Sequence, residues 1–145
     1  MPIAVTDKGK LISTANAASY NGVAYLPAAN ALAVVVVAAA GTDSVGSMTG
    51  GPNPWMPITR TLFNAAGDVA LIFIQQGHPS PASMQPVFQC SDNNGTGCCI
   101  QQYEVTGQEG VYYRQAVNTQ GTGANPSLTF PLAINSSNAI MVGFG

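Results

Sequence analysis

One apolar run dominates the pattern of hydrophobic and polar positions: Leu32–Ala40 has the sequence Leu-Ala-Val-Val-Val-Val-Ala-Ala-Ala. Four consecutive valines are stiff at χ1, which disfavours a helix and suits a pleated strand. Because both alternating faces of the run are apolar, the pattern predicts a strand buried on both sides. The run is too short to span a membrane as a helix, which needs about 20 apolar residues. Val69–Ile74 has the same character, and we expect both runs to be central strands.

The rest of the chain alternates between short strand-like stretches and clusters of Gly, Pro, Asn, Asp and Ser. No stretch has a sustained helical period with caps, and no linker divides the chain. Short strands separated by turns at roughly 8–12 residues predict an all-β domain with two packed sheets, a β-sandwich of jelly-roll-like type. Besides the two central runs, the predicted extended stretches are 11–15, 23–26, 45–48, 58–63, 84–90, 98–105, 111–116, 127–130 and 139–144.

The two ends of the chain differ in their expected roles. Residues 1–10 hold two of the four cations, Lys8 and Lys10, and we expect a flexible arm there, ahead of a sandwich domain of residues 11–145. The last predicted strand, 139–144, is apolar, and it would suit pairing with a neighbouring chain.

The predicted hairpin of residues 84–90 and 98–105 contains the three cysteines. Pairing Phe88 with Ile100 would set Cys90 opposite Cys98 on one face, within the Cα separation that a disulfide spans. The alternative is three reduced cysteines packed as apolar side chains. A disulfide between Cys90 and Cys98 would form only after release from a reducing cytoplasm.

Charge is scarce in this chain. Of 145 residues, 46% are hydrophobic and only 7% are charged, against about 25% charged in an ordinary soluble domain. The formal net charge is -2, and the only cations are Lys8, Lys10, Arg60 and Arg114. Basic side chains supply most of the affinity for nucleic acid and for anionic lipid, and four are too few for either. We expect no nucleic-acid partner and no membrane partner.

The residues that commonly carry catalysis are isolated from one another. The sole histidine, His78, lies between Gly77 and Pro79 in a predicted loop, and the chain has no Gly-x-Ser-x-Gly motif. Asp43, Asp68 and Asp92 lie beside turn residues, where aspartate caps its own backbone. Glu104 is the only carboxylate predicted within a strand, and the sequence indicates no partner for it. We therefore expect no catalytic residues and no enzyme activity.

Metal and cofactor sites are not indicated either. Cys98 and Cys99 are adjacent in a predicted strand, so their side chains point to opposite faces, and one distant histidine cannot complete a zinc site. The Gly-Thr-Gly segments lack the lysine and helix of a phosphate loop. The lone tryptophan, Trp55, lies in a proline-rich segment, either as a lid over one end of the core, which we favour, or as an aromatic anchor for a partner or a sugar.

Several segments, in their order along the chain, resemble the jelly-roll-type β-sandwich module of bacteriophage virion proteins, which include capsid decoration proteins and head or tail fibres. The likeness spans roughly residues 31–145 and lies in strand pattern and turn residues. Where such modules often have a Gly-Asn-Thr-Trp-like turn, residues 52–55 are Pro-Asn-Pro-Trp. The segments that carry the resemblance are 31–37, 43–49, 103–107 and 123–129.

The resemblance implies a structural virion protein, and we expect a capsid decoration (cement) subunit on the capsid exterior. Its partners would be the major capsid protein and copies of itself, as a homotrimer. The first residues lack the basic start and apolar core of a signal peptide. We therefore expect the protein to be synthesised in a host cytoplasm and to function outside the cell, as part of the virion. The alternatives are a phage fibre or tail component, and a carbohydrate-binding sandwich that uses Trp55, Tyr25, Tyr112 and Tyr113. A small hydrolase ranks far behind.

Overall fold

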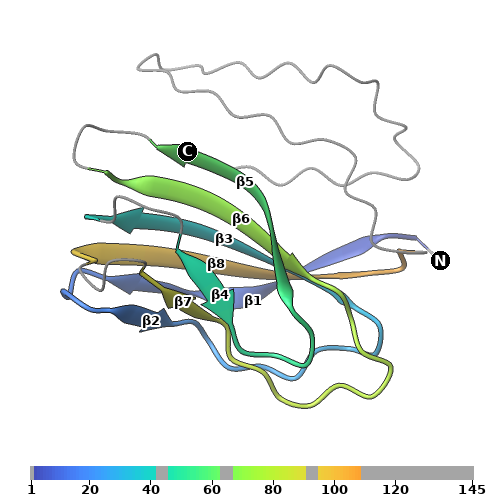
Figure 1. Cartoon of the computed structure of the whole chain (residues 1–145). Helices are drawn as coiled ribbons and strands as arrows, with labels where there is room; N and C mark the ends of the chain where they lie inside the picture. Colours follow the sequence, from blue (N-terminus) through green and yellow to red (C-terminus); the bar gives the residue numbers. More distant parts are fainter. Residues whose placement is uncertain (1, 42–45, 63–66, 91–94, 109–145) are drawn as a thin grey trace, which may run out of the picture.

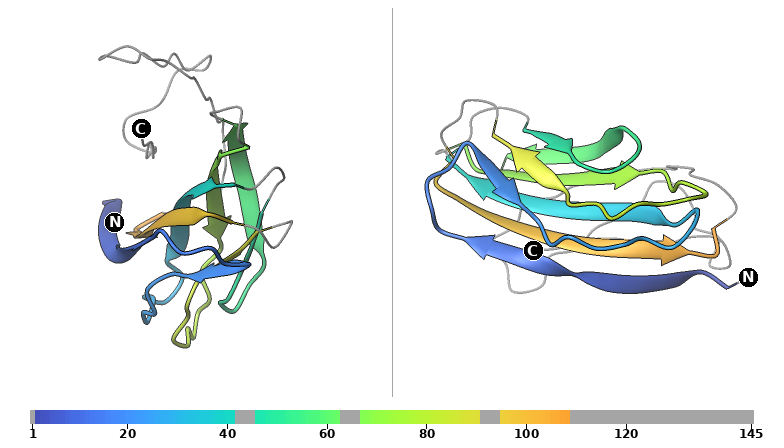
Figure 2. Two further views of the ribbon diagram at one scale, coloured as in Figure 1. Left: turned by 90° about the vertical axis from the view of Figure 1, so that its left-hand side faces the viewer. Right: turned by 90° about the horizontal axis from the view of Figure 1, so that it is seen from below.

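A computed structural model describes residues 2–41, 46–62, 67–90 and 95–108 of the chain. The strands are β1 Ala4–Ser13, β2 Ser19–Asn21, β3 Leu32–Ala40, β4 Ser47–Thr49, β5 Trp55–Leu62, β6 Val69–Gln75, β7 Val87–Gln89 and β8 Gly97–Thr106. They form two antiparallel sheets that lie face to face, one with the order β1-β8-β3-β6-β5 and one with the order β2-β7-β4 (Figure 1 and Figure 2). The described residues contain no helix. The predicted all-β, two-sheet sandwich is therefore confirmed.

The middle strand of the larger sheet is β3, with the bounds that the sequence predicted. It pairs with β6 on one side and with β8 on the other, so that Val36 lies opposite both Ile72 and Gln101. Val35 and Val36, which point to opposite faces, are 0% and 5% exposed. The prediction of two central strands buried on both faces is confirmed for β3, and β6 also begins at the predicted Val69.

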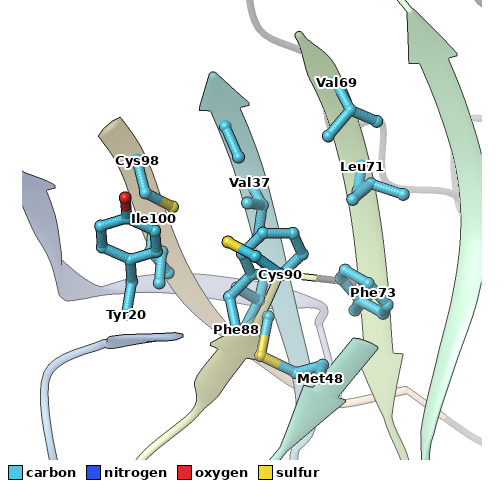
Figure 3. Packing of buried hydrophobic residues seen from close by; sticks show 12 residues of the cluster. Tyr20, Val37, Met48, Val69, Leu71, Phe73, Phe88, Cys90, Cys98 and Ile100 are labelled. Carbon is cyan, nitrogen blue, oxygen red and sulfur yellow. The ribbon is translucent and has the colours of Figure 1, made fainter. Parts of the chain in front are cut away.

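Side chains from both sheets meet in one apolar cluster, which we call the inner cluster (Figure 3). The larger sheet contributes alternate residues of β3, β6 and β8, and the smaller sheet contributes one side chain from the centre of each of its strands. The rings of Phe73 and Phe88, from opposite sheets, have centroids 6.4 Å apart and an interplanar angle of 57°. The buried members are Tyr20, Val35, Val37, Ala39, Met48, Val69, Leu71, Phe73, Phe88, Cys90, Cys98 and Ile100.

The opposite face of the larger sheet, which we call the outer face, has a second buried cluster. Its burial explains why β3 is apolar at consecutive positions and not at alternate ones. The buried members are Val34, Ile74 and Val105, and Ile3, Leu32, Ile58, Ile72 and Tyr103 pack against them.

The expected N-terminal arm is instead most of β1, an edge strand of the larger sheet. It pairs with β8 along its whole length, from Ala4 opposite Thr106 to Ser13 opposite Cys98. A bulge between Asp7 and Gly9 shifts the register, and Gly9 has a φ of 112°, which a residue with a side chain rarely adopts. The two lysines suggested a solvated arm, but the bulge turns Lys8 towards the interior while Lys10 stays exposed.

The predicted hairpin of residues 84–90 and 98–105 is wrong. Strand β7 pairs with β2 and β4 in the smaller sheet, whereas β8 pairs with β1 and β3 in the larger one. Phe88 lies opposite Tyr20 and Met48, and Ile100 lies opposite Leu11 and Val37. Both belong to the inner cluster, so the apolar pattern marked residues that face each other across the sandwich, not neighbours within one sheet.

Smaller differences concern the first half of the chain. The segment 49–57, whose three prolines and two glycines predict a loop, contains the first residues of β5. The proline at 57 is tolerated because β5 is an edge strand with a bulge between Pro57 and Thr59. The segment 23–26 is not a strand but has one bridge, Tyr25 opposite Met84. The predicted strands 111–116, 127–130 and 139–144 lie outside the described residues.

Candidate functional site

Three polar side chains are buried on the inner face of the larger sheet, at one end of the inner cluster. Gln75 of β6, Gln102 of β8 and Glu104 of β8 are 2%, 0% and 5% exposed. Ala33 of β3 lies between Gln75 and Glu104, since it is opposite both residues. Burying such groups costs free energy unless they are hydrogen-bonded. The hydrogen-bond partner of each side chain therefore indicates whether it has a structural role or is available to a ligand.

Gln102 holds the loop that connects β2 to β3. Its Oε1 accepts a hydrogen bond from the Val23 main-chain N–H at 2.5 Å, and its Nε2 donates to the Val23 carbonyl at 2.8 Å. The amide thus pairs with one residue of the loop as a neighbouring strand would. A Cβ at position 22 would lie 2.4 Å from Oε1 of Gln102, so this approach requires glycine at Gly22.

Glu104 holds the same loop further along and binds a lysine as well. Its Oε2 accepts a hydrogen bond from the Ala28 main-chain N–H at 2.7 Å, and its Oε1 lies 2.9 Å from Nζ of Lys8. Lys8 reaches inward from the β1 bulge, and its Nζ lies 5.6 Å from the centroid of the Tyr25 ring. This arrangement gives Glu104 the partner that the sequence did not reveal, and it balances a buried negative charge with a positive one.

Tyr25 completes this cluster with an unusual feature. Its hydroxyl is buried and has no hydrogen-bond partner among the residues that the structure describes. Burial, with a smaller contribution from the negative charge of Glu104, raises the pKa of Tyr25 to about 12. The hydroxyl therefore stays protonated at neutral pH.

Gln75 anchors a second loop, the one that connects β4 to β5. Its Nε2 donates to the Asn53 carbonyl at 2.5 Å and approaches the Gly50 carbonyl at 3.3 Å. The Trp55 indole N–H donates to the same Gly50 carbonyl at 2.5 Å, and the Trp55 side chain packs against the inner cluster. This geometry agrees with the interpretation of Trp55 as a lid over one end of the core.

The buried polar cluster itself encloses little space. A hollow lined by Pro27, Ala31, Gln75 and His78 has a volume of about 10 Å³, roughly enough for one water molecule. A second hollow, on the outer face beside Met56 and Ile74, has a volume of about 320 Å³ and is open to solvent, and none of the three buried polar side chains lines it. The polar atoms of Gln102 and one oxygen of Glu104 bind main-chain groups of the protein itself, which leaves them unavailable to a ligand.

The structure does not bring the other polar residues named from the sequence into one site. His78 Nδ1 interacts only locally, with the main chain of Ser80 at 2.8 Å and 3.1 Å. Asp68 accepts a hydrogen bond from the Gly41 N–H at 3.0 Å, across 27 residues of sequence, whereas the sequence predicted a contact with its own backbone. Asp43 and Asp92 lie outside the described residues. Within the described part of the chain, no group of three or more His, Cys, Asp or Glu residues could hold a metal ion.

Cys90 and Cys98 lie in the inner cluster, and neither they nor Cys99 form a disulfide bond. The register from which we predicted their pairing is wrong, although both residues do lie in the same cluster (Figure 3). Burial, with smaller contributions from Cys90 and Cys99, raises the pKa of Cys98 to about 12. Because thiol–disulfide exchange requires the thiolate, Cys98 is unreactive at neutral pH while the protein is folded.

Comparisons with known proteins give no family for this chain. No protein-family model, no curated protein sequence and no solved structure matches it. Among the described residues, no helix is long and apolar enough to cross a membrane.

Proposed function

We propose that this protein is a structural virion subunit, a capsid decoration protein that binds the outside of a bacteriophage shell and stabilises it. Its partners would be the major capsid protein and copies of itself, as a homotrimer, and it would be made in the host cytoplasm. The observation that supports a structural role is the use of the buried polar groups: Gln75, Gln102 and Glu104 all bind main-chain atoms of the protein's own loops. A site built for chemistry would aim such groups at a ligand.

The composition supports the same proposal. With 7% charged residues and a net charge of -2, the surface is polar but nearly neutral, which suits close packing of many identical copies without mutual repulsion. A shell presents many identical sites, so modest contacts repeated over neighbouring copies give a large combined affinity. The internally fastened loops provide a rigid surface for such contacts, and rigidity lowers the entropic cost of binding.

The test compares intact particles with particles stripped of this protein. We expect stripped shells to disassemble at a lower temperature, and adding back the purified chain to restore the original melting temperature. Stripped shells that receive buffer without the chain serve as the control, and their melting temperature should stay low. Unchanged melting after stripping, or location of the protein on a tail fibre, would contradict the decoration role and favour the fibre alternative.

The carbohydrate-binding alternative is ranked behind because two of its aromatic residues make internal contacts. Trp55 packs on the inner cluster, and Tyr25 packs beside Lys8. Tyr112 and Tyr113 lie outside the described residues. A glycan array distinguishes the two functions, since specific binding to one glycan class would support the carbohydrate-binding role.

A further inference from the structure

The sheet edges formed by the described strands differ in how well they are protected against pairing with another chain. The edges of the smaller sheet, β2 and β4, are three residues long. At one edge of the larger sheet, β5 contains Pro57, which cannot donate a main-chain hydrogen bond to another strand. At the other edge, β1 is ten residues long and, although it has a bulge between Asp7 and Gly9 as β5 has one between Pro57 and Thr59, it contains no proline. A long edge strand is a template for pairing with another strand.

The bulge in β1 gives this edge a particular surface. Val5, Asp7, Lys10 and Ile12 lie opposite Val105, Tyr103, Gln101 and Cys99 of β8, which are alternate residues and therefore share one face. In a regular strand, residues 5 and 7 would point away from residues 10 and 12. The bulge adds one residue between Asp7 and Lys10, which turns residues 10 and 12 to the same side as residues 5 and 7. All four side chains therefore lie on the outer face of the sheet.

This row of side chains is complementary to itself. Along β1 it has the order apolar, acidic, basic, apolar. When two copies of β1 run antiparallel with Asp7 opposite Lys10, Val5 also lies opposite Ile12. A twofold axis makes each pair occur twice. Shifting the register by one residue in either direction separates Asp7 from Lys10, and one of those shifts places Lys8 opposite Lys10.

The side chains of this row are also accessible. Val5 is 52% exposed and Ile12 is 67% exposed. Asp7 is held in place, since its Oδ1 accepts hydrogen bonds from the Gly9 N–H at 2.7 Å and from Nε2 of Gln101 at 2.8 Å. A lysine commonly blocks an edge strand. Of the two lysines of β1, Lys8 is turned inward and paired with Glu104, whereas Lys10 stays exposed, and in the antiparallel register its charge is met by Asp7 of the other copy.

We propose that the β1 edge is an interface between two copies of this chain, formed by antiparallel pairing of β1 with β1 and with Asp7 opposite Lys10. The pairing would join two five-stranded sheets into one continuous sheet across a twofold axis. The occupant is a second copy because the sequence of apolar and charged positions complements itself. This inference does not depend on the decoration function, and the twofold contact is separate from the threefold association expected there.

Sedimentation equilibrium of the full chain at several concentrations tests the proposal. We expect a monomer–dimer equilibrium for the wild type. Lys10→Glu brings two pairs of carboxylates together, and we expect it to raise the dimer dissociation constant at least about tenfold. Ile12→Ser should also weaken the dimer, because it removes two apolar cross-strand contacts. Met56→Lys, an equally exposed position on β5 at the far edge of the same sheet, is the matched control and should leave the equilibrium unchanged.

Two further measurements test the register. Mixing the Lys10→Glu chain with an Asp7→Lys chain restores opposite charges at both positions, so the mixture should dimerise more strongly than either variant alone. Mixing Val5→Cys and Ile12→Cys chains, both also carrying Cys99→Ser because Cys99 lies opposite residue 12, under oxidising conditions should give a link between residues 5 and 12, identified by peptide mass spectrometry. A monomeric wild type, a dimer or trimer insensitive to both Lys10→Glu and Ile12→Ser, or links only between like positions would overturn the proposal.

Discussion

Replacing Gln102 with leucine is the most direct test of how the loop between β2 and β3 is held. Leucine has a similar volume but cannot form the two hydrogen bonds to Val23. The variant therefore leaves a main-chain N–H and a main-chain carbonyl without partners beside a fully buried position. The fold should survive, because the inner cluster around β8 gains an apolar side chain.

The magnitude follows from these two groups. Each unsatisfied buried group costs about 1–3 kcal/mol, and the apolar side chain regains about 1 kcal/mol. We expect Gln102→Leu to lower the free energy of unfolding by about 1–5 kcal/mol. Gln101→Leu is the matched control: Gln101 points to the opposite face, and its hydrogen bond to Asp7 is exposed. We expect this control to cost less than about 1 kcal/mol.

Urea denaturation measures both variants, and amide hydrogen exchange locates the effect. In the wild type the Val23 N–H should be protected, and in Gln102→Leu its protection should be lost while the β3 amides stay protected. If Gln102→Leu is as stable as Gln101→Leu and the Val23 amide exchanges slowly in both, the reasoning about the loop is wrong.

Four other predictions concern individual side chains. Tyr25→Phe removes a buried hydroxyl without a partner and should leave stability at pH 7 unchanged or raise it by up to about 1 kcal/mol in urea denaturation. Because the folded-state pKa values of Tyr25 and Cys98, both about 12, exceed the ordinary values of 10.0 and 9.0, the unfolded state loses these protons first. The contribution of these two groups to stability should therefore be constant below about pH 9 and fall as the pH rises to about 12, with a smaller fall above pH 10 in Tyr25→Phe; a profile that stays flat between pH 9 and pH 12 would contradict this. Val36→Asp buries an unpaired charge in the middle of the larger sheet and should abolish soluble expression, so a folded variant would refute the strand assignment. Native alkylation followed by mass spectrometry should modify Cys99 first and Cys90 and Cys98 only after unfolding, and a link from Cys90 to Cys99 after oxidation would contradict the faces described.

The sequence predicted those parts of the fold that depend on local pattern. The apolar run of β3 has only one physical interpretation, burial on both faces, and the structure bears it out. The neighbours of β7 and of β8 in their separate sheets were not predictable in the same way. An alternation of apolar residues shows which side chains are buried, but it does not show to which sheet the strand belongs. Phe88 and Ile100 share a cluster from opposite layers, and the sequence makes them look like partners in a hairpin.

The candidate site was predictable only as isolated residues. Glu104 stood out as a carboxylate within a strand, but its partner Lys8 lies far away in the sequence, in a segment expected to be an arm. The bulge that directs Lys8 inward depends on Gly9, and Asp-Lys-Gly-Lys resembles a solvated segment. Gln75 and Gln102 gave no signal, since a glutamine in a strand is usually exposed and only the approach of a loop makes it buried.

The manner in which the β2–β3 loop is fastened has a consequence for its sequence. Gln102 and Glu104 grip it at the main-chain atoms of Val23 and Ala28, and the bridge at Tyr25 also uses main-chain groups. Between these points Leu26 is 65% exposed. These hydrogen bonds involve the main chain of the loop and not its side chains. Substitutions at the outward-facing residues of the loop can therefore accumulate during evolution without weakening its attachment. The same property makes the loop a natural position for displaying foreign peptides on the surface of the protein.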